Sequence, residues 1–283
     1  MKILVVGSTG ALGRHVVPRL VERGHKVKAI IRRPESAPFI EQVGAEPVLG
    51  DIFDRGSLDG AARGCEAAMH LATAIPKDPN QGWALNDRIR REGTRSFLAA
   101  ATANGLRRYV QQSIALVYGE HGQEIVDESV PHQIDPINHS ASDMEALVRE
   151  SRLEWCILRG GFFYGTGTGR EESWRQAARE GRLELPGEGD DLVSLVNVVD
   201  MARAAAIAVE GAPAGSVYNI VDDEPVSYKR LFAYIAVQQS APAPKAGGPK
   251  FLPSLGCSNA KAKRELDWAP VFPTFRSGLA QRA

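Results

Sequence analysis

The sequence predicts an α/β fold built on a doubly wound parallel sheet, with a smaller lobe toward the C-terminus. Short apolar runs alternate with longer stretches of helical spacing through the first two thirds of the chain. A glycine-rich turn follows the first apolar run, and the alternation weakens after Arg159. Because repeated strand–helix–strand units form parallel sheets covered by helices on both faces, these observations together predict that fold class.

Each apolar run is predicted to be a buried strand because it is short and bounded by turn residues or helical patterns. The predicted strands are Ile3–Val6, Val27–Ile31, Glu46–Leu49, Ala67–Ala72, Tyr109–Gln112 and Trp155–Leu158. Between them, Arg14–Glu22 and Gly93–Ala103 carry apolar residues at helical spacing. Residues 240–256 are rich in proline and glycine, which predicts a loop.

Composition excludes several classes of function. The 283 residues include 34 basic and 34 acidic side chains, so the chain has no net positive charge that would attract nucleic acid. The six histidines show no metal-ligand spacing, which predicts that no metal is bound. No apolar run reaches the length of a signal peptide or membrane span, and the three scattered cysteines favour reduced thiols. We therefore expect a cytoplasmic protein without a nucleic-acid or membrane partner.

The strongest motif is Gly7-Ser8-Thr9-Gly10-Ala11-Leu12-Gly13, which lies between the first predicted strand and the first predicted helix. Glycine suits a sharp turn, a close approach of backbone to a pyrophosphate, and tight packing of the helix on the sheet. The helix N-terminus offers unpaired N–H groups to phosphates. These seven residues predict a dinucleotide site, and the alternative is a tight turn of purely structural value.

The end of the second strand indicates which dinucleotide binds. Enzymes that use NAD place a carboxylate there for the ribose hydroxyls, whereas this strand ends in Arg32-Arg33 with no acidic residue before them. A guanidinium pairs with a 2′-phosphate and stacks on adenine, so the sequence favours NADP(H) over NAD(H). The alternative is two solvated arginines at a strand end.

Further short motifs occur in a fixed order along the whole chain. They are Gly50-Asp51, His70-Leu71-Ala72, Gly93-Thr94, Val117-Tyr118-Gly119, Leu158-Arg159, Val198-Val199-Asp200 and Tyr218-Asn219. With the G-x-x-G-x-x-G spacing, they make the chain resemble the extended and atypical short-chain dehydrogenase/reductases, which include sugar-nucleotide epimerases and dehydratases. The resemblance implies a Rossmann-type sheet and an oxidoreductase, epimerase or dehydratase that acts on a small molecule.

The resemblance also implies a domain division and cofactor contacts. Residues 1–159 would form the dinucleotide domain, with later strands returning from about 190–222, and residues 160–283 a discontinuous substrate lobe. Asp51 and Ile52 would contact adenine, although Asp51 also suits a turn or a helix cap. Leu71, on the fourth strand, would be among the cofactor-binding residues, and Ala72 and Thr73 would pass beneath the pyrophosphate and ribose. A homodimer is a further implication.

The catalytic residues of the family are missing from their expected positions. Hydride-transferring members use a Ser or Thr after the fifth strand and a Tyr-x-x-x-Lys pair, because a carbonyl oxygen needs a proton as hydride arrives. By the resemblance, these three positions fall on Ile114, Ile137 and Ala141. The family's Asn, three residues before Gly93, is replaced by Arg90.

Other residues are candidates for the proton donor. His139 and Asp143 are four apart and would share a helix face, but Ser140 with Asp143 also matches a helix N-cap that His139 merely precedes. Tyr118 lies beside the expected nicotinamide end and alternatively packs beneath a loop. Ser113 is a weaker candidate, because strand side chains alternate between the two faces.

The aromatic run Phe162-Phe163-Tyr164, with Trp174 further on, follows the last predicted strand. Ligands of doubly wound sheets bind beyond the carboxyl ends of the strands, so these residues are predicted to line a substrate pocket. They would favour an apolar or aromatic small molecule. The alternative is that they form the core of the smaller lobe.

Three functions therefore remain open. The first is an NADP(H)-dependent oxidoreductase, or an epimerase or dehydratase relative, with a non-standard active site. The second is a catalytically silent NADP(H) sensor or scaffold. The third is a non-redox cyclase or isomerase on the same fold. Substrate, direction, stereochemistry, proton donor and oligomeric state are not predicted by the sequence, and fold alone does not choose between the three functions.

Overall fold

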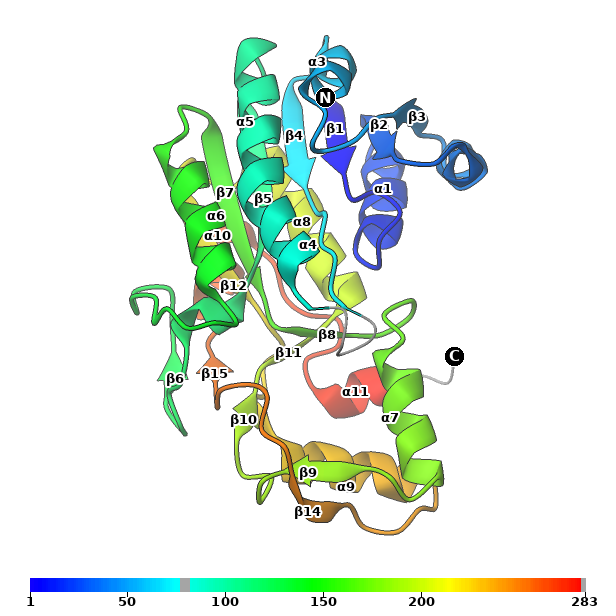
Figure 1. Cartoon of the computed structure of the whole chain (residues 1–283), viewed down its shortest axis with the longest axis vertical. Helices are drawn as coiled ribbons and strands as arrows, with labels where there is room; N and C mark the ends of the chain where they lie inside the picture. The colour runs from blue at the N-terminus through cyan, green and yellow to red at the C-terminus, as the bar shows by residue number, and fades with distance from the viewer. Residues whose placement is uncertain (77–81, 281–283) are drawn as a thin grey trace. The chain divides into compact units, whose positions relative to one another are not determined.

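The computed structural model describes residues 1–76 and 82–280 of the chain (Figure 1). Its largest element is a seven-stranded sheet with the order β12-β7-β5-β4-β1-β2-β3. The pairs β1–β2, β1–β4, β2–β3 and β4–β5 are all parallel. In Figure 1 helices α5 and α6 lie in front of this sheet and α8 lies behind it. The predicted fold class is confirmed.

The first half of the chain follows the predicted alternation of strands and helices. Its elements are β1 (Lys2–Val6), α1 (Gly13–Glu22), β2 (Lys26–Ile31), the 3-10 turn η1 (Pro34–Ser36), α2 (Ala37–Gln42), β3 (Glu46–Leu49), α3 (Arg55–Ala62), β4 (Ala67–His70), α4 (Ala84–Arg88), the π-helical segment η3 (Ile89–Gly93), α5 (Thr94–Ala103), β5 (Arg108–Ile114), the 3-10 turn η4 (Ala115–Tyr118) and β6 (Ile125–Val126).

The second half contains more short strands. Its elements are α6 (His139–Glu150), β7 (Glu154–Gly160), β8 (Phe162–Tyr164), α7 (Arg170–Arg179), β9 (Glu184–Pro186), β10 (Leu192–Val193), β11 (Leu195–Asn197), α8 (Val198–Gly211), β12 (Ser216–Ile220), β13 (Val226–Ser227), α9 (Tyr228–Gln238), β14 (Lys245–Gly248), β15 (Gly256–Cys257), α10 (Ala260–Leu266) and α11 (Phe275–Leu279).

The chain divides into two compact units that alternate along the sequence. Unit 1 comprises Met1–Ser113, Ile137–Leu158 and Ala202–Val217, and unit 2 comprises Ile114–Pro136, Arg159–Met201 and Tyr218–Ala283. The sequence predicted a main boundary near 159, and the chain does pass into unit 2 there. It did not predict that residues 114–136 join unit 2. Of the segment predicted to return at about 190–222, Ala202–Val217 lies in unit 1.

Unit 1 is built around the sheet and its buried apolar strands. All residues of β1 beyond Lys2 are buried, as in sheets covered on both faces. Its core cluster takes residues from strands and helices alike: Leu4, Val6, Ile30, Ile52, Leu58, Ala61, Ala62, Cys65, Ala68, Ile89, Phe97, Leu98, Ala100, Ala101, Leu106, Tyr109, Val148, Leu153, Ile157 and Val217.

Unit 2 has its own hydrophobic core, formed around α9 and short strand pairs. The cluster comprises Tyr164, Ala178, Leu183, Leu185, Val193, Leu195, Val226, Tyr228, Leu231, Phe232, Ile235, Phe275 and Leu279. The prediction of a loop over residues 240–256 was wrong in part, because Lys245–Gly248 form β14, which pairs with β9 in parallel. No helix in the described part of the chain is both long and apolar enough to span a membrane.

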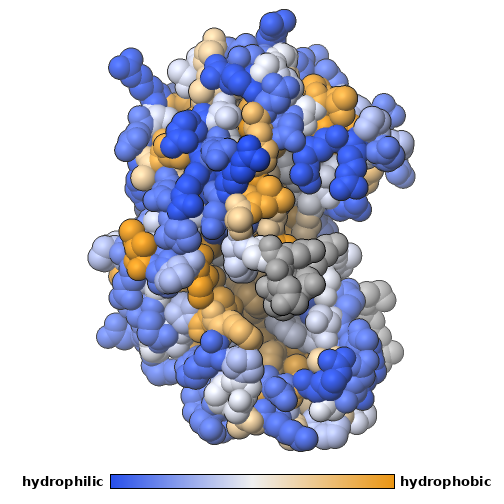
Figure 2. All heavy atoms as spheres, viewed as in Figure 1, coloured by the Kyte–Doolittle hydropathy of each residue, from blue (hydrophilic) through white to orange (hydrophobic). Residues whose placement is uncertain are grey.

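Most of the surface shown in Figure 2 is hydrophilic, with hydrophobic residues in separate patches. Several large apolar side chains of unit 1 are nevertheless exposed, among them Ile75, Trp83, Leu85 and Ile137. The first three flank the start of α4, and Ile137 lies just before α6. Apolar side chains are thus presented on the segments that follow β4 and precede α6.

Candidate cofactor and active site

The glycine loop forms a cradle with no room for side chains at two of its three glycines. A Cβ on Gly7 would lie 2.5 Å from the backbone nitrogen of Ala72, and Gly7 has a φ of +84°. A Cβ on Gly13 would lie 2.1 Å from the carbonyl oxygen of Gly7. Gly10 is different, since its Cβ would meet only that same oxygen, at 3.4 Å. The backbone therefore needs glycine at positions 7 and 13, and position 10 is open toward a ligand.

The loop leads directly into the N-terminus of α1. The N–H groups of Gly10 and Arg14 donate to Gly7 and Gly10 carbonyls. Within residues 1–76 and 82–280, the N–H groups of Leu12 and Gly13 have no acceptor. Unpaired N–H groups at the start of a helix bind phosphate well, because the helix dipole adds partial positive charge. The cradle and these donors fit a dinucleotide pyrophosphate.

Two buried side chains hold this cradle in place. Ser8 is fully buried, and its hydroxyl donates to the carbonyl of Ile30 on β2 at 2.8 Å. His70 at the end of β4 is also fully buried, and its Nδ1 accepts from the N–H of Ala72 at 3.3 Å. Burial lowers the pKa of His70 to about 3, so its ring is neutral. The side chain of Ser8 thus supports the fold, and the predicted contact of Ser8 with the cofactor stays a prediction.

Three arginines lie near the end of β2 and the start of α1. Arg32 and Arg33 are exposed, and neither has a hydrogen-bond or ion-pair partner in the described part of the chain. Arg14, which the sequence analysis did not single out, donates from Nε to the carbonyl of Thr9 and stacks on the ring of Phe39 in α2. The position of Arg14 directly after Gly13 was the available signal. Among the described residues, the Arg32 and Arg33 guanidinium groups thus have no protein partner that would compete with a phosphate.

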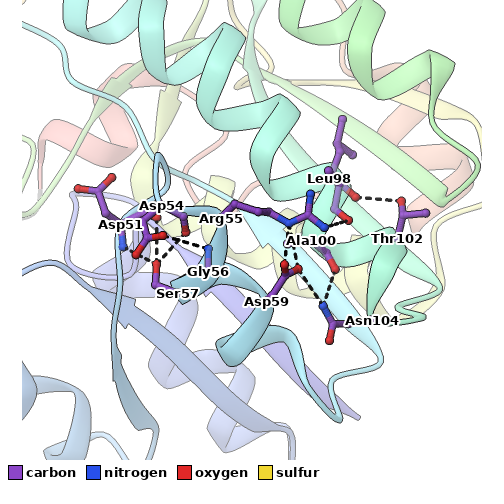
Figure 3. Close-up of polar contacts among 11 residues, drawn as sticks. Asp51, Asp54, Arg55, Gly56, Ser57, Asp59, Leu98, Ala100, Thr102 and Asn104 are labelled. Carbon is purple, nitrogen blue, oxygen red and sulfur yellow. Dashed lines mark hydrogen bonds and ion pairs between the residues drawn. The ribbon is translucent and has the colours of Figure 1, made fainter.

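Asp51 forms a turn after β3. Its carboxylate accepts from the N–H of Phe53 at 2.9 Å, and its own N–H donates to the hydroxyl of Ser57. The side chain that caps α3 is Asp54, which accepts from Gly56; Figure 3 shows Ser57 between Asp51 and Asp54. The helix-cap interpretation of Asp51 was therefore wrong, and the turn interpretation is confirmed.

The remaining adenine-side and strand-end residues differ in exposure. Ile52 is buried and lies against Gly93, where a Cβ would approach its Cδ1 to 2.9 Å. Leu71 is buried, whereas Ala72 is partly exposed and Thr73 exposed. The contacts of these residues with a cofactor stay predictions.

Near the expected catalytic positions, the side chains are apolar or already engaged. Ile137 is 39% exposed and Ala141 is fully buried. The Ser113 hydroxyl, 1% exposed, donates to Oε1 of Glu145 on α6 at 2.7 Å. A hydroxyl committed to a buried carboxylate is poorly placed to protonate a substrate.

His139 and Asp143 do not form the pair considered from the sequence. Asp143 accepts from Nε of Arg91 at 2.6 Å, and His139 Nε2 lies 3.8 Å from a carboxylate oxygen of Asp87. The N-cap interpretation of Ser140 was also wrong: α6 begins at His139 with Asn138 as its N-cap. The Ser140 hydroxyl does not cap the helix because it accepts a hydrogen bond from Nη1 of Arg90 at 3.1 Å.

Arg90 itself is the functional candidate that the sequence analysis missed. It lies in the π-helical segment η3 and is 6% exposed. Its burial lowers its pKa to about 10, while the nearby negative charge of Asp87 opposes this, so the group is charged at neutral pH. The sequence shows Arg90 at the position where the family has Asn, but it does not show that the Arg90 side chain is buried.

Tyr118 lies in a buried network in unit 2. Its hydroxyl donates to Oδ1 of Asn219 at 2.8 Å and accepts from Nη1 of Arg159 at 2.7 Å. Burial raises the pKa of Tyr118, although the Arg159 charge opposes the shift. The network unites residues from three of the sequence motifs. The Tyr118 side chain is fully buried and its hydroxyl is bonded, so packing describes it better than proton donation.

The aromatic run after β7 divides between core and surface. Tyr164 is fully buried in the core of unit 2. Phe162 stacks on Trp174 with ring centroids 6.4 Å apart, and Arg170 lies over Phe162 at 3.5 Å. Phe162, Phe163 and Trp174 keep part of their surfaces exposed. Tyr164 is therefore a core residue of the smaller lobe, as the alternative interpretation held. A pocket role for Phe162, Phe163 and Trp174 stays a prediction.

Comparison with known proteins agrees with this geometry. A family model described as NAD(P)H-binding matches residues 7–186, well over half of the chain. A dTDP-glucose 4,6-dehydratase from Streptomyces venezuelae, solved with NAD and TYD bound, superposes with a TM-score of 0.86 and 24% identity. That superposition covers 99% of this chain and 95% of the other. It shows the shared fold.

Several of the similar curated proteins are named as reductases. A 3-diazoavenalumate denitrifying reductase of a Streptomyces species is 32% identical, over 99% of this chain and all of the relative. A 4-hydroxy-2-methyl-3-oxo-4-farnesyl-3,4-dihydroquinoline-1-oxide ketoreductase of Stigmatella aurantiaca is 28% identical, over 98% of this chain and 84% of the relative. Together with the cradle, these relatives support an oxidoreductase role. The chain belongs to the NAD(P)H-binding family and has the fold of the epimerases and dehydratases among the extended short-chain dehydrogenase/reductases.

Proposed function

We propose that the chain is an NADP(H)-dependent reductase whose substrate accepts hydride without a tyrosine proton donor, and that aryl diazo compounds are the substrate class. The glycine cradle supports the proposal, together with the expectation from the family resemblance that Ile137 and Ala141 stand at the Tyr and Lys positions. A ketone reductase needs that proton donor, because the carbonyl oxygen becomes an alkoxide.

A diazo substrate removes this requirement. An aryl diazonium group already carries positive charge, so its terminal nitrogen accepts hydride without prior protonation. When bound, NADPH supplies the hydride: the diazonium ion plus hydride gives an aryl diazene, which loses N2 to leave the arene, and NADP⁺ is the other product. The denitrifying reductase that is 32% identical over the whole chain supports this class.

The exposed apolar residues of unit 1 support an aromatic substrate. Ile75, Trp83, Leu85 and Ile137 lie on the segments around α4 and before α6, which adjoin the strand ends where ligands of parallel sheets bind. Aromatic and aliphatic side chains dominate the walls of small-molecule sites. The family tyrosine position is thus occupied by a side chain suited to contact an aromatic ring.

Turnover of a diazo substrate tests the proposal. A ¹⁵N-labelled 2-hydroxyaryl diazonium salt is mixed with the protein and NADPH, and both loss of absorbance at 340 nm and release of ¹⁵N2 are recorded. We expect one N2 for each NADPH consumed. Gly10→Trp, which places an indole over the open position of the loop, is the control for uncatalysed reduction. A wild-type rate equal to that control contradicts the proposal, and reduction of simple ketones at a higher rate replaces it with an ordinary ketoreductase.

The cofactor preference is tested separately by equilibrium binding. Titration with NADPH and NADH, followed by energy transfer from tryptophan to the nicotinamide, is expected to give at least a tenfold tighter Kd for NADPH, about 1.4 kcal/mol. Arg32→Ala and Arg33→Ala are expected to remove most of this difference, because they remove the guanidinium groups offered to the 2′-phosphate. Arg63→Ala, at another exposed arginine, is the matched control. Equal affinity for the two cofactors in the wild type would refute the preference.

A further inference from the structure

Arg90 is a buried cation with no ion-pair partner among the described residues. Its guanidinium makes one hydrogen bond, to the Ser140 hydroxyl, and no carboxylate lies within 4 Å of it in the part of the chain that the structure describes. Asp87, whose charge acts on Arg90, lies 3.8 Å from the ring of His139 instead. A buried charge without a close ion-pair partner destabilises the fold, and proteins retain such groups mostly where a ligand completes them.

Two neighbours on the same helix face each have one side-chain polar atom without a partner among the described residues. Asn86, Arg90 and Thr94 are spaced four apart along the continuous helix formed by α4, η3 and α5, so they share one face. All three are at least nine-tenths buried. Among the described residues, Asn86 Nδ2 and Thr94 Oγ1 have no hydrogen-bond partner. Buried polar groups are normally satisfied, so three incomplete ones on one face indicate a site for a polar ligand.

This polar face is connected to the glycine cradle within unit 1. The Oδ1 of Asn86 accepts from the N–H of Ala74 at 3.0 Å. Two residues earlier, Ala72 lies against Gly7 of the cradle. On the other side, Arg90 contacts Ser140, next to Ala141, where the side chain ends at Cβ. The π-helical turn that contains Arg90 is of a kind that occurs frequently at functional sites.

We propose that Arg90 binds an anionic oxygen of the substrate, the carboxylate of an aromatic acid, and holds its ring for hydride transfer. A guanidinium fork donates two parallel hydrogen bonds to a carboxylate. Ala141, next to Ser140 on α6, carries no charge of its own that would compete with Arg90 for an anion. The name of the 32% identical relative describes a substrate that is itself a carboxylate. The inference deepens the proposed function, because it names the group that selects the substrate.

Equilibrium binding tests the role of Arg90 without any turnover. A failure of the Arg90 proposal can therefore be distinguished from a failure of the diazo proposal. The probes are 4-hydroxycinnamate and its methyl ester, each titrated into protein saturated with NADP⁺. We expect the wild type to bind the acid at least 30-fold more tightly than the ester. Arg90→Met is expected to abolish that difference with little change in ester affinity, and Arg90→Lys to restore part of it.

The controls separate binding from folding and from cofactor affinity. Arg91→Met changes the neighbouring arginine, whose ion pair with Asp143 is exposed, and is expected to leave both affinities unchanged. Arg90→Met is expected to keep or raise Tm, because it removes an unpaired buried charge, and to keep the Kd for NADPH within twofold. Weak binding of the acid by the wild type, an unchanged acid–ester difference in Arg90→Met, or a tenfold loss of NADPH affinity in that variant would overturn the proposal. The last outcome would assign Arg90 to the cofactor.

Discussion

Gly13→Ala is expected to destroy the cofactor cradle. The added Cβ would lie 2.1 Å from the Gly7 oxygen and 2.6 Å from the carbonyl carbon of Ser8. Both are backbone atoms, and Ser8 is fixed by its hydrogen bond to β2. Neither atom can therefore move without displacing the loop from the sheet. Overpacking a rigid site costs up to about 3 kcal/mol, and here we expect the upper end. NADPH affinity should fall at least 100-fold, since the loop loses its shape.

Urea unfolding and fluorescence titration with NADPH measure the two effects in one preparation. Gly10→Ala is the matched control, because its Cβ would meet only the Gly7 oxygen, at an ordinary contact distance of 3.4 Å. That variant is expected to fold with wild-type stability. A Gly13→Ala protein that binds NADPH with the wild-type Kd would show that the cradle is not where the pyrophosphate lies.

Asp200→Ala is expected to release the segment after α10 from the start of α8. The Asp200 carboxylate is fully buried and accepts from the N–H groups of Val271 and Phe272 at 2.7 and 2.9 Å. Alanine would remove the acceptor of both N–H groups, and that of the buried Phe272 would be left unsatisfied. Hydrogen bonds to a charged group contribute roughly 1.5–3 kcal/mol each, so the loss should be about 3–5 kcal/mol.

The unfolding free energy in urea checks the size of this loss, and Trp268 reports its location. The indole of Trp268 is 1% exposed and donates to the Asp200 carbonyl at 3.1 Å, so release of this segment should shift the tryptophan emission to longer wavelength. Asp190→Ala, at an exposed aspartate of unit 2, should change neither measurement. A loss below 1 kcal/mol in Asp200→Ala would mean that the segment is held by apolar packing alone.

The parts of the site that the sequence predicted depend on local geometry. The glycine cradle and the strand ends around it involve a turn, a helix start and apolar runs, all of which are encoded within a few residues. Strand β2, predicted from Val27, begins one residue earlier at Lys26, whose side chain is exposed and carries no apolar signal. Position 13 needs glycine for a contact only six residues away.

The parts that it did not predict depend on packing between distant segments. Ser140 has the side chain of an N-cap, but Arg90, 50 residues earlier, takes its hydroxyl. Lys245–Gly248 looks like a loop in the sequence because the segment is short and rich in glycine. It becomes a strand through pairing with β9, a segment that is distant in the sequence. The burial of Arg90 follows from α6 packing on η3, which no local pattern encodes.

The alternation of the two units along the chain has a consequence for the evolution of this protein. The chain leaves one unit for the other after residues 113, 136, 158, 201 and 217, so neither unit is encoded by a continuous stretch of the gene. A single recombination event therefore cannot exchange one complete unit for that of a relative. New substrate ranges must instead arise by point substitution or by short insertions within several separate segments. For the same reason, a chimera made by joining two relatives at one site would inherit a mixture of both units, and libraries for directed evolution should be designed segment by segment.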